Sequence, residues 1–473
     1  MTSTHQPTAA PARDLTPWLL AAILLLSTLL RLGVALYLGN TLEETRGGTY
    51  DQISYDLLAQ RVADGHGFSF AVDTWPYARA NQPTAFWSYL YTLYLTLIYA
   101  IFGHQPLIAR LIQGVIVGVL MPWLVWRIAR RPFGSRVGLI AAGITAIYFY
   151  FIHYAASLMS EAFYLVGILW TVDVGMRLAE MLADPRTNQR RTLALGLEFG
   201  LAMSLTLLLR QVVIGFFTVL ALWLLWIALH HHAVRRVLGV FVATAAVTGL
   251  LILPFVARNY QVFGRLTMPN TNAGFTFFWS NHPIYGTHFE AVLSPSHGIS
   301  YQELIPPDLR DLNEAALDRA LLLRGLQFVR DDPGRYLLLS LSRVPVYFQF
   351  WPTSDSTRLS NAARMLSFGL FLPFMLYGLI LGASHLRRSG PLRPNLAVVD
   401  GTPDLRAAYV ALFLLFILVY TAIHLASWAN VRYRLPVDAF LILFAAYGID
   451  DVLRRLARRR SGSWGDAQPQ PSS

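Results

Sequence analysis

The sequence predicts an all-α polytopic integral membrane protein with about ten transmembrane helices. Of its 473 residues, 55% are hydrophobic and only 14% are charged, and the mean hydropathy is +0.45. Apolar runs of about 20 residues, the length that crosses ~30 Å of hydrocarbon, recur along the chain. This composition excludes an ordinary soluble enzyme.

The placement of the basic residues supports the same fold class. The net charge is +11, which in a soluble protein would suggest nucleic-acid binding. Here the arginines lie between the apolar runs, as anchors to the inner leaflet do, and nucleic acid is therefore rejected as a partner. The chain contains no cysteine, which excludes disulfides, thiolate metal sites and cysteine nucleophiles.

The first span is expected from about residue 17 to residue 38. Residues 1–16 are polar and are expected to form a disordered cytoplasmic tail. A first external loop follows at 39–104. Its second half, 84–102, is apolar but rich in Tyr and Trp, which prefer the interface. We interpret it as a juxtamembrane or re-entrant helix because a crossing there would place the next arginine cluster outside, although the sequence leaves a crossing open.

Six further spans complete a predicted seven-span module over residues 17–256. They are expected at roughly 105–126, 137–154, 158–177, 192–209, 211–229 and 237–256. With this topology the arginine-rich loops between the spans fall on the cytoplasmic side, as the positive-inside rule requires.

The remaining chain is expected to form a large external loop and three C-terminal spans. The loop, 257–362, is too long for a simple connector, and it includes a second ambiguous apolar stretch at 336–351 that we also assign to the outer surface. The C-terminal region 363–455 holds the last spans, predicted at about 363–383, 406–424 and 434–452. Residues 456–473 are expected to be a disordered cytoplasmic tail.

A short amphipathic helix is expected between the first span and the turn formed by Gly65-x-Gly67. Asp51 and Tyr55 share one face of this helix, whereas Asp56 is turned in another direction. At most one of the two carboxylates should therefore face a site. An ordinary solvated interfacial helix would show the same charge pattern.

Further ionisable residues gather on the side of the membrane predicted to be external, at the ends of spans. Each would cost about 2.5 kcal/mol or more at the membrane centre. They are His153, Glu161, Arg210, Arg258, Arg432 and Arg434, with Tyr433 between the last two. Arginines on this side oppose the positive-inside rule, and together they indicate an anionic partner.

Structural explanations stay open for several of these residues. An arginine at the end of a span can extend to the interface without binding anything. Glu161 and Arg210 can form a buried structural ion pair, and His153 can be a satisfied residue at a helix end. Arg110 is expected to hold the external helices, and Asp173 to have a structural role near the inner end of its span.

A set of motifs occurs in order along most of the chain. It comprises Asp51-x-x-x-Tyr55-x-x-x-Ala59 before Gly65-x-Gly67, Pro83 and the aromatic run to Phe102-Gly103, Arg110 with Gln113, Arg131-Pro132-Phe133-Gly134, Ser160-Glu161, Arg258-Asn259-Tyr260, Phe263-Gly264, Asn272-Ala273-Gly274 and Arg432-Tyr433-Arg434-Leu435-Pro436. Together these motifs resemble the GT-C class of membrane glycosyltransferases, in particular the bacterial branch similar to protein O-mannosyltransferases and the lipid A aminoarabinose transferase.

The resemblance implies a GT-C fold and transfer of a hexosyl or pentosyl group from a polyprenyl-phosphate donor, such as an undecaprenyl phosphate sugar. The acceptor would be a hydroxyl group of a lipid, a protein or a polysaccharide. Transfer would invert the anomeric centre, use no nucleotide sugar, and take place on the extracytoplasmic face of a bacterial plasma (inner) membrane during synthesis of the cell envelope.

The same likeness implies roles for individual residues. Asp51 would be the general base, and Glu161 would orient the sugar or an arginine. The residues expected to bind the donor phosphate or sugar are Arg210, Arg258, Arg432, Arg434, Tyr433, Tyr55, Asp56 and His153. No metal or other cofactor is expected with a monophosphate donor. Gln52 and the segment 81–84 depart from the family pattern, which leaves the donor sugar and the metal requirement open.

Two other functions are kept as alternatives. A transporter or flippase of lipid-linked saccharides would carry polar residues near the bilayer midplane and Gly/Pro-broken helices in matching halves. Here the polar residues gather at one face, which favours chemistry at a surface. An O-antigen ligase-like enzyme would also use lipid-linked sugars and external arginines, but its donor would be a diphosphate.

Overall fold

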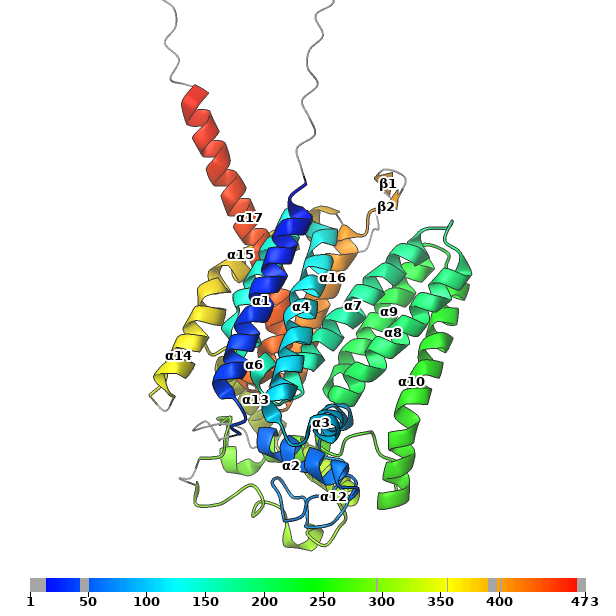
Figure 1. The fold of residues 1–473 in the computed structure, drawn as a ribbon, viewed down its shortest axis with the longest axis vertical. Coiled ribbons are helices and arrows are strands. Elements are labelled where there is room, and N and C mark those ends of the chain that lie inside the picture. The colour runs from blue at the N-terminus through cyan, green and yellow to red at the C-terminus, as the bar shows by residue number, and fades with distance from the viewer. Residues whose placement is uncertain are drawn as a thin grey trace, which may run out of the picture.

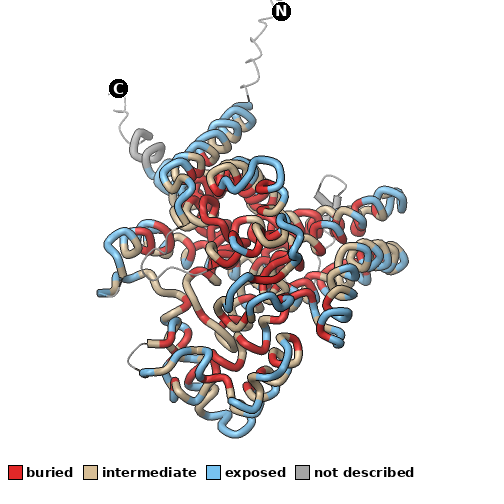
Figure 2. Tube along the Cα trace, turned by 60° about the horizontal axis from the view of Figure 1, so that its bottom comes forward, coloured by how far each residue is buried: buried red, intermediate tan, exposed pale blue. Residues whose placement is uncertain are grey.

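The structure is a computed structural model that describes residues 14–42, 51–294, 297–354, 356–389, 398–399 and 402–465. Long helices run side by side in one bundle, and shorter helices cover one of its ends (Figure 1). Buried residues follow the centre of the bundle and continue into that end, whereas the outward faces of the peripheral helices are exposed (Figure 2). The predicted all-α polytopic architecture is confirmed.

Eight helical segments in the described part of the chain are long and apolar enough to cross a membrane. They are α1 (Thr16–Leu38), α4 (Pro106–Phe133), α7 (Glu161–Ala183), α8 (Gln189–Leu209), η1 with α9 (Gln211–Val213 and Ile214–His230), α10 (Val234–Phe263), α14 with η5 and α15 (Arg358–Arg364, Met365–Gly369 and Leu370–Ser389) and α16 (Arg406–Ala426). The pair α5 (Ser135–Ile147) and α6 (Phe149–Ala156), bent by 54°, makes a ninth if it is one span.

The tenth predicted span coincides with α17 (Leu435–Gly465), which differs from the other long helices. It carries Asp438, Asp450 and Asp451, and it packs against α5, α15 and α16. Asp438 is fully buried and binds Arg434, with 2.8 Å between Oδ1 and Nε. Because its first half is enclosed by other helices, α17 can hold a charge pair that a lipid-facing helix could not. In the described chain, α17 is not among the eight or nine segments that are long and apolar enough to cross a membrane by length and composition.

The two ends of the bundle differ in character. We call the end covered by short helices the loop end and the opposite end the arginine-rich end. The elements at the loop end are α2 (Asp51–Ala63), α3 (Tyr89–Phe102), α11 (Ala273–Ser280), η2 (Pro283–Tyr285), η4 (Pro307–Leu309), α12 (Glu314–Asp331), α13 (Pro333–Tyr347) and η6 (Val431–Arg434). The described strands, β1 (Val398–Val399) and β2 (Thr402–Pro403), form one two-residue antiparallel pair.

Helix α3 occupies residues 89–102 of the stretch 84–102 that the sequence left ambiguous. Its 14 residues extend about 21 Å at 1.5 Å per residue, too short to cross ~30 Å of hydrocarbon. It lies across the loop end and is seen nearly end-on in Figure 1, where the long helices run upright. Its geometry therefore agrees with a juxtamembrane helix.

The loop end has its own cluster of buried hydrophobic side chains, in which α11, α12 and α13 meet. Phe278, Leu317, Leu321 and Leu339 are completely buried there. At ~25 cal/mol per Å² of apolar surface, burying several such side chains stabilises the segment by several kcal/mol. The residues after α10 therefore form a packed layer over the bundle.

A buried arginine supports the bend between α5 and α6. Arg31 of α1 is fully buried and donates hydrogen bonds from its Nη atoms to the carbonyl oxygens of Thr145 and Ala146, both at 3.3 Å, and of Ser27 at 2.9 Å. The α5 helix ends at Ile147, so the carbonyls of its last turn lack partners within the helix. Arg31 supplies those partners inside the bundle, which allows α6 to turn toward the loop end.

Small residues allow α8 and α10 to approach closely. Gly196 and Gly200 of α8 face Val240 and Thr244 of α10. A Cβ atom at Gly200 would lie 3.0 Å from the Cα of Thr244, closer than most Cβ contacts in proteins, so a larger residue there would force the helices to shift. The spacing of four residues places both glycines on one helix face, as at many helix contacts in membranes.

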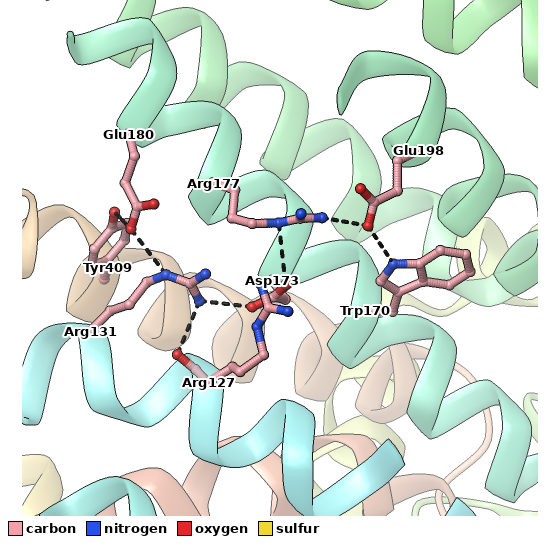
Figure 3. Close-up of polar contacts among 8 residues, drawn as sticks. All are labelled: Arg127, Arg131, Trp170, Asp173, Arg177, Glu180, Glu198 and Tyr409. Carbon is pink, nitrogen blue, oxygen red and sulfur yellow. Dashed lines mark hydrogen bonds and ion pairs between the residues drawn. The ribbon is translucent and has the colours of Figure 1, made fainter. Parts of the chain in front are cut away.

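The arginine-rich end is held by ion pairs that join α4 and α7. Asp173 binds three arginines, with shortest N to O distances of 3.0 Å for Arg127, 2.8 Å for Arg131 and 3.5 Å for Arg177 (Figure 3). Arg131 also binds Glu180 at 3.0 Å. Asp173 is almost completely buried, so the arginines offset the cost of its desolvation. The structural role expected for Asp173 fits these contacts.

Candidate active site

The loop end encloses a cavity of about 610 Å³. Segments from distant parts of the sequence form its walls: α2, the segment between α2 and α3, the turn between α8 and α9, α11, the end of α16, and η6. One side of the cavity carries Asp51, Arg210, Arg432 and Tyr433, and most of the remaining wall is apolar or aromatic. The cavity is therefore polarised, with its charges concentrated at one side.

The first residue of α2 contacts the turn that precedes α17. The Oδ2 atom of Asp51 accepts a hydrogen bond from the Nη1 atom of Arg432, and both side chains are largely buried. Asn430 fixes the backbone of this turn, since its Oδ1 accepts a hydrogen bond of 3.0 Å from the amide of Arg432. The side chain of Arg432 is thereby directed across the cavity toward α2.

Glu161 joins two arginines into one charged cluster. Its Oε1 atom accepts a hydrogen bond of 2.7 Å from Nη2 of Arg210 and lies 3.3 Å from Nε of Arg432. The Oε2 atom is buried and has no hydrogen-bond partner among the described residues. Glu161 is the first residue of α7, where the helix dipole favours a negative charge. The four residues Asp51, Arg432, Glu161 and Arg210, which we call the charged cluster, form a continuous chain of contacts.

The two arginines of the charged cluster are held in the protonated state. Burial alone would lower the pKa of Arg210, but Glu161 raises it above its ordinary value. For Arg432, burial is likewise outweighed, by Asp51 and then by Tyr433 and Glu161, and its pKa is raised. Both guanidinium groups also lie over the ring of Tyr433, at 5.4 Å for Arg210 and 5.0 Å for Arg432. The cavity thus presents two permanent positive charges.

Aromatic packing and one amide fix the position of α2. The ring of Tyr55 contacts Trp87 and Tyr91 edge to face, with centroid distances of 5.1 and 4.9 Å. Burial raises the pKa of Tyr55 to about 12, so its hydroxyl stays neutral. Oε1 of Gln52 accepts a hydrogen bond of 3.0 Å from the amide of Leu158. Gln52, which departs from the family pattern, therefore attaches α2 to the segment that leads into α7.

The segment before α7 is held from the other side by α4. Arg110 donates from Nε to the carbonyl oxygen of Ala156 at 3.1 Å. Gln113 donates from Nε2 to the carbonyl oxygens of Ala155 and Ser157 at 2.9 and 2.8 Å. The expected role of Arg110 in holding the external helices fits these contacts, which fix the backbone just ahead of Glu161.

The structure places four of the residues predicted from the sequence away from the charged cluster. Asp56 faces the opposite side of α2, where it accepts hydrogen bonds of 2.5 Å from Tyr99 and 2.9 Å from His104. This agrees with the expectation that only one carboxylate of α2 faces a site. The ring of His153 packs against Phe149 and Tyr154, and it does not line the cavity within the described chain.

The other two displaced residues are arginines that bind other parts of the protein. Arg258 donates to the hydroxyl of Tyr89 at 2.8 Å and to the carbonyl oxygen of Thr84 at 3.0 Å. Arg434 is completely buried and binds Asp438 of α17 and the carbonyl oxygen of Tyr347. Neither residue lines the cavity within the described chain, and both brace the backbone around it.

Several cavity residues were not predicted as site residues from the sequence. They are Trp75, Trp87, Gln211, Asn270, Trp279, His424 and Trp428, together with Asn272, which was noted only as part of a motif. They come from separate segments, so no local spacing joins them. A usable signal was present at Gln211, the direct neighbour of Arg210, because a polar residue beside an arginine at a span end lies at the same depth. The described residues contain no group of three or more His, Cys, Asp or Glu side chains placed to share a metal ion.

Comparison with known proteins gives one family match and a shared fold. Residues 88–257 match the family model of dolichyl-phosphate-mannose-protein mannosyltransferase. No curated protein matches the chain. The oligosaccharyltransferase AglB of Archaeoglobus fulgidus, solved with an inhibitory peptide and a dolichol-phosphate, is 16% identical with a TM-score of 0.55; the alignment covers 98% of this chain and 53% of AglB.

Two further solved structures complete the comparison. The Archaeoglobus fulgidus oligosaccharyltransferase tethered to an acceptor peptide is 17% identical with a TM-score of 0.56, over 97% of this chain and 52% of that one. ArnT of Cupriavidus metallidurans, bound to undecaprenyl phosphate, is 13% identical over 92% of this chain and 78% of ArnT, with a TM-score of only 0.40. The chain spans about half the length of the oligosaccharyltransferases that it matches.

The family match lies over the helices that deliver Arg210 and Glu161, and the shared fold extends over nearly the whole chain. The oligosaccharyltransferases belong to the GT-C class, so the likeness indicated by the motifs is confirmed at the level of the fold. This chain has a GT-C fold, and its residues 88–257 match the dolichyl-phosphate-mannose-protein mannosyltransferase family.

Proposed function

We propose that the protein is a glycosyltransferase that moves a sugar from a polyprenyl-phosphate donor to an acceptor hydroxyl group on the extracytoplasmic face of the membrane. The observation that carries the proposal is the charged cluster at one side of the cavity, in which a carboxylate lies beside two arginines. The matched family is named for a lipid-phosphate sugar donor, and AglB was solved with a dolichol-phosphate.

The arginines suit the charge change of this reaction. The donor is a phosphate diester with one negative charge, and the leaving polyprenyl phosphate is a monoester with close to two. Arg210 and Arg432 would stabilise the charge that develops as the bond from the anomeric carbon to the phosphate oxygen breaks. Removal of an oriented donor of this kind typically costs about 100-fold or more in rate.

Asp51 is the proposed general base. It would take the proton of the acceptor hydroxyl while that oxygen forms a bond to the anomeric carbon. A single displacement of this kind inverts the anomeric centre, since the new bond forms opposite the bond that breaks. Glu161 would act as a positioning residue, because it contacts both arginines and has no direct part in the proton transfer.

The contact between Asp51 and Arg432 suggests how donor binding prepares the base. In the structure the guanidinium of Arg432 donates to Oδ2 of Asp51. A donor phosphate that takes over Arg432 would leave this oxygen free to accept a hydrogen bond from the acceptor hydroxyl. Glu161 keeps a second contact to Arg432 and would retain the arginine in place.

The proposal is tested by transfer assays with the purified protein. Polyprenyl-phosphate sugars carrying a hexose or a pentose should give turnover and release of polyprenyl phosphate. Polyprenyl-diphosphate glycans should give none. Turnover only with the diphosphate donors would favour the ligase-like alternative, and carrier-mediated movement across vesicles without turnover would favour a flippase.

A further inference from the structure

The arginine-rich end contains a second cavity of about 610 Å³ that the proposed function does not use. The ends of α4, α15 and α16 and the middle of α17 form its walls. The lining residues that matter for binding are Pro132, Phe133, Arg406, Tyr447, Arg454 and Arg455. Helices of membrane-spanning length end or begin here, so the cavity lies at the depth of lipid headgroups.

The cavity is positively charged, with four lining arginines against two lining aspartates. The aspartates are partly or fully committed to the protein. Asp450 is almost completely buried and binds Arg136 at 2.8 Å and Arg454 at 2.6 Å. Asp451 accepts a hydrogen bond of 2.6 Å from the hydroxyl of Tyr377. The carboxylates therefore orient the arginines, and a net positive charge remains.

The arginines keep hydrogen-bond donors available. The Nε atoms of Arg406, Arg454 and Arg455 face Asp404, Asp450 and Asp451 at 3.8, 2.6 and 2.7 Å. Their Nη atoms make no hydrogen bond with another described residue, and the three side chains are 58%, 55% and 65% exposed. Guanidinium Nη groups held in this way match the two free oxygens of a phosphate diester.

An apolar surface adjoins these donors. The rings of Phe133 and Tyr447 stack at 4.5 Å with an angle of 15° between their planes, and Pro132 lies beside them. Arg406 is the first residue of α16, where the helix dipole adds to the attraction for an anion. A ligand that fits both features has a phosphate group next to an apolar part.

We propose that this cavity binds the headgroup of an anionic glycerophospholipid, such as phosphatidylglycerol. The phosphate diester would lie between the Nη groups of Arg406, Arg454 and Arg455, and the start of the acyl chains would contact Phe133 and Tyr447. A zwitterionic lipid carries a cation that the arginines repel. The site is separate from the Asp51 cavity and does not depend on the proposed transferase activity.

The test compares lipid binding to the full-length purified protein by native mass spectrometry. The double variant Arg406→Gln/Arg455→Gln should bind phosphatidylglycerol about 30-fold more weakly, given about 1 kcal/mol for each arginine near an anionic lipid. The matched control Arg190→Gln/Arg191→Gln removes two exposed arginines at the N-terminus of α8, outside the cavity, and should bind within about twofold of the wild type.

Three results would overturn the proposal. The first is an equal loss of binding in the cavity variant and in the control. The second is wild-type binding of phosphatidylcholine as tight as that of phosphatidylglycerol. The third is displacement of the lipid by inorganic phosphate at a comparable concentration, which would indicate a site for a free anion. If the double variant does not fold, Arg406→Gln alone serves, because its exposed side chain pairs with Asp404 at the long distance of 3.8 Å.

Discussion

Asp51 and Arg432 are 381 residues apart in the sequence, and their side chains form an ion pair inside one cavity. The pair connects the helix after the first span to the turn before the last helix. Two opposite charges offset part of each other's desolvation cost, so burying either side chain here without the other would cost more free energy. The pair therefore links α2 to η6 at the loop end. It also places a carboxylate beside the arginines of the charged cluster.

The first prediction concerns the proposed base. Asp51→Asn should lower the rate of sugar transfer by at least ~100-fold, because an amide cannot accept the proton of the acceptor hydroxyl. The fold should survive, since Arg432 keeps its contact with Glu161. The measurement is turnover with a polyprenyl-phosphate sugar, together with thermal unfolding of both proteins.

A matched substitution controls for the loss of charge on this segment. Asp64 lies just after α2 and is exposed, so Asp64→Asn should leave turnover within about twofold of the wild type. If Asp51→Asn retained more than about a tenth of the activity, Asp51 would not be the base.

The second prediction concerns Glu161. Glu161→Gln removes the charge that contacts both Arg210 and Arg432, and it leaves like charges close together in a buried site. Loss of one partner of a buried pair costs about 3 to 5 kcal/mol, so the free energy of unfolding should fall by about this amount. The fall is reduced by the stabilisation that Asp51 still gives to Arg432. Denaturant unfolding measures the change.

The control for Glu161 is an exposed glutamate with a similar partner. Glu180 binds Arg131 but is 47% exposed, and Glu180→Gln should cost about 1 kcal/mol or less. A loss in Glu161→Gln no larger than in this control would show that the charged cluster contributes little to the fold. Addition of a polyprenyl-phosphate donor should recover part of the loss, because its phosphate can pair with the two arginines.

The third prediction tests Arg31. Arg31→Met keeps the apolar part of the side chain but leaves the carbonyl oxygens of Thr145 and Ala146 without the donor seen in the structure. Unsatisfied buried groups cost about 1 to 3 kcal/mol each, so thermal unfolding should occur several degrees lower. The control is Leu36→Met on the exposed face of the same helix, which should leave the unfolding temperature unchanged. Equal decreases of the unfolding temperature in both variants would show that Arg31 does not support the bend.

The fourth prediction is a pH dependence at the loop end. Asp318 of α12 accepts hydrogen bonds of 2.7 and 3.1 Å from the amides of Gly274 and Phe275. Burial raises its pKa from 3.8 to about 6, against the effect of these two bonds, and the charge of Glu314 adds to the increase. The folded state thus takes up a proton at a higher pH than the unfolded state does.

The sign of the effect follows from that difference. The stabilisation from protonated Asp318 is fully present below about pH 4 and is lost as the pH rises through about 6. Wild-type stability, measured relative to Asp318→Asn, should therefore fall between about pH 4 and about pH 6. An unchanged difference between the two proteins over this interval would show that Asp318 has an ordinary pKa.

Much of the fold could be predicted from the sequence. The positions of the long helices follow from the length of the apolar runs alone. Each helix must form its backbone hydrogen bonds within itself and must be long enough to span the hydrocarbon core. The bend at residue 148 and the buried Arg31 were not predicted, since both depend on contacts between α1 and α5. The charge pair of Asp438 with Arg434 inside the last predicted span was also not predicted, because it depends on the helices that enclose the first half of α17.

The candidate site was predictable only in part. Helical spacing indicated that Asp51 and Asp56 face different directions, and the structure shows them doing so. The sequence alone could not rank the four arginines at the ends of spans. Arg210 and Arg432 line the cavity, while Arg258 and Arg434 bind backbone and side chains elsewhere.

The sequence by itself determined that this protein is a bundle of membrane-length helices with ionisable residues gathered at the ends of the spans. Those features follow from local composition and from the free-energy cost of placing charge in hydrocarbon. Both act on each segment independently of the other segments. Only the tertiary structure decided which charges meet, because a side chain finds its partner through the packing of helices far apart in the chain. The contact of Asp51 with Arg432 is the clearest case, since nothing in either segment specifies the other.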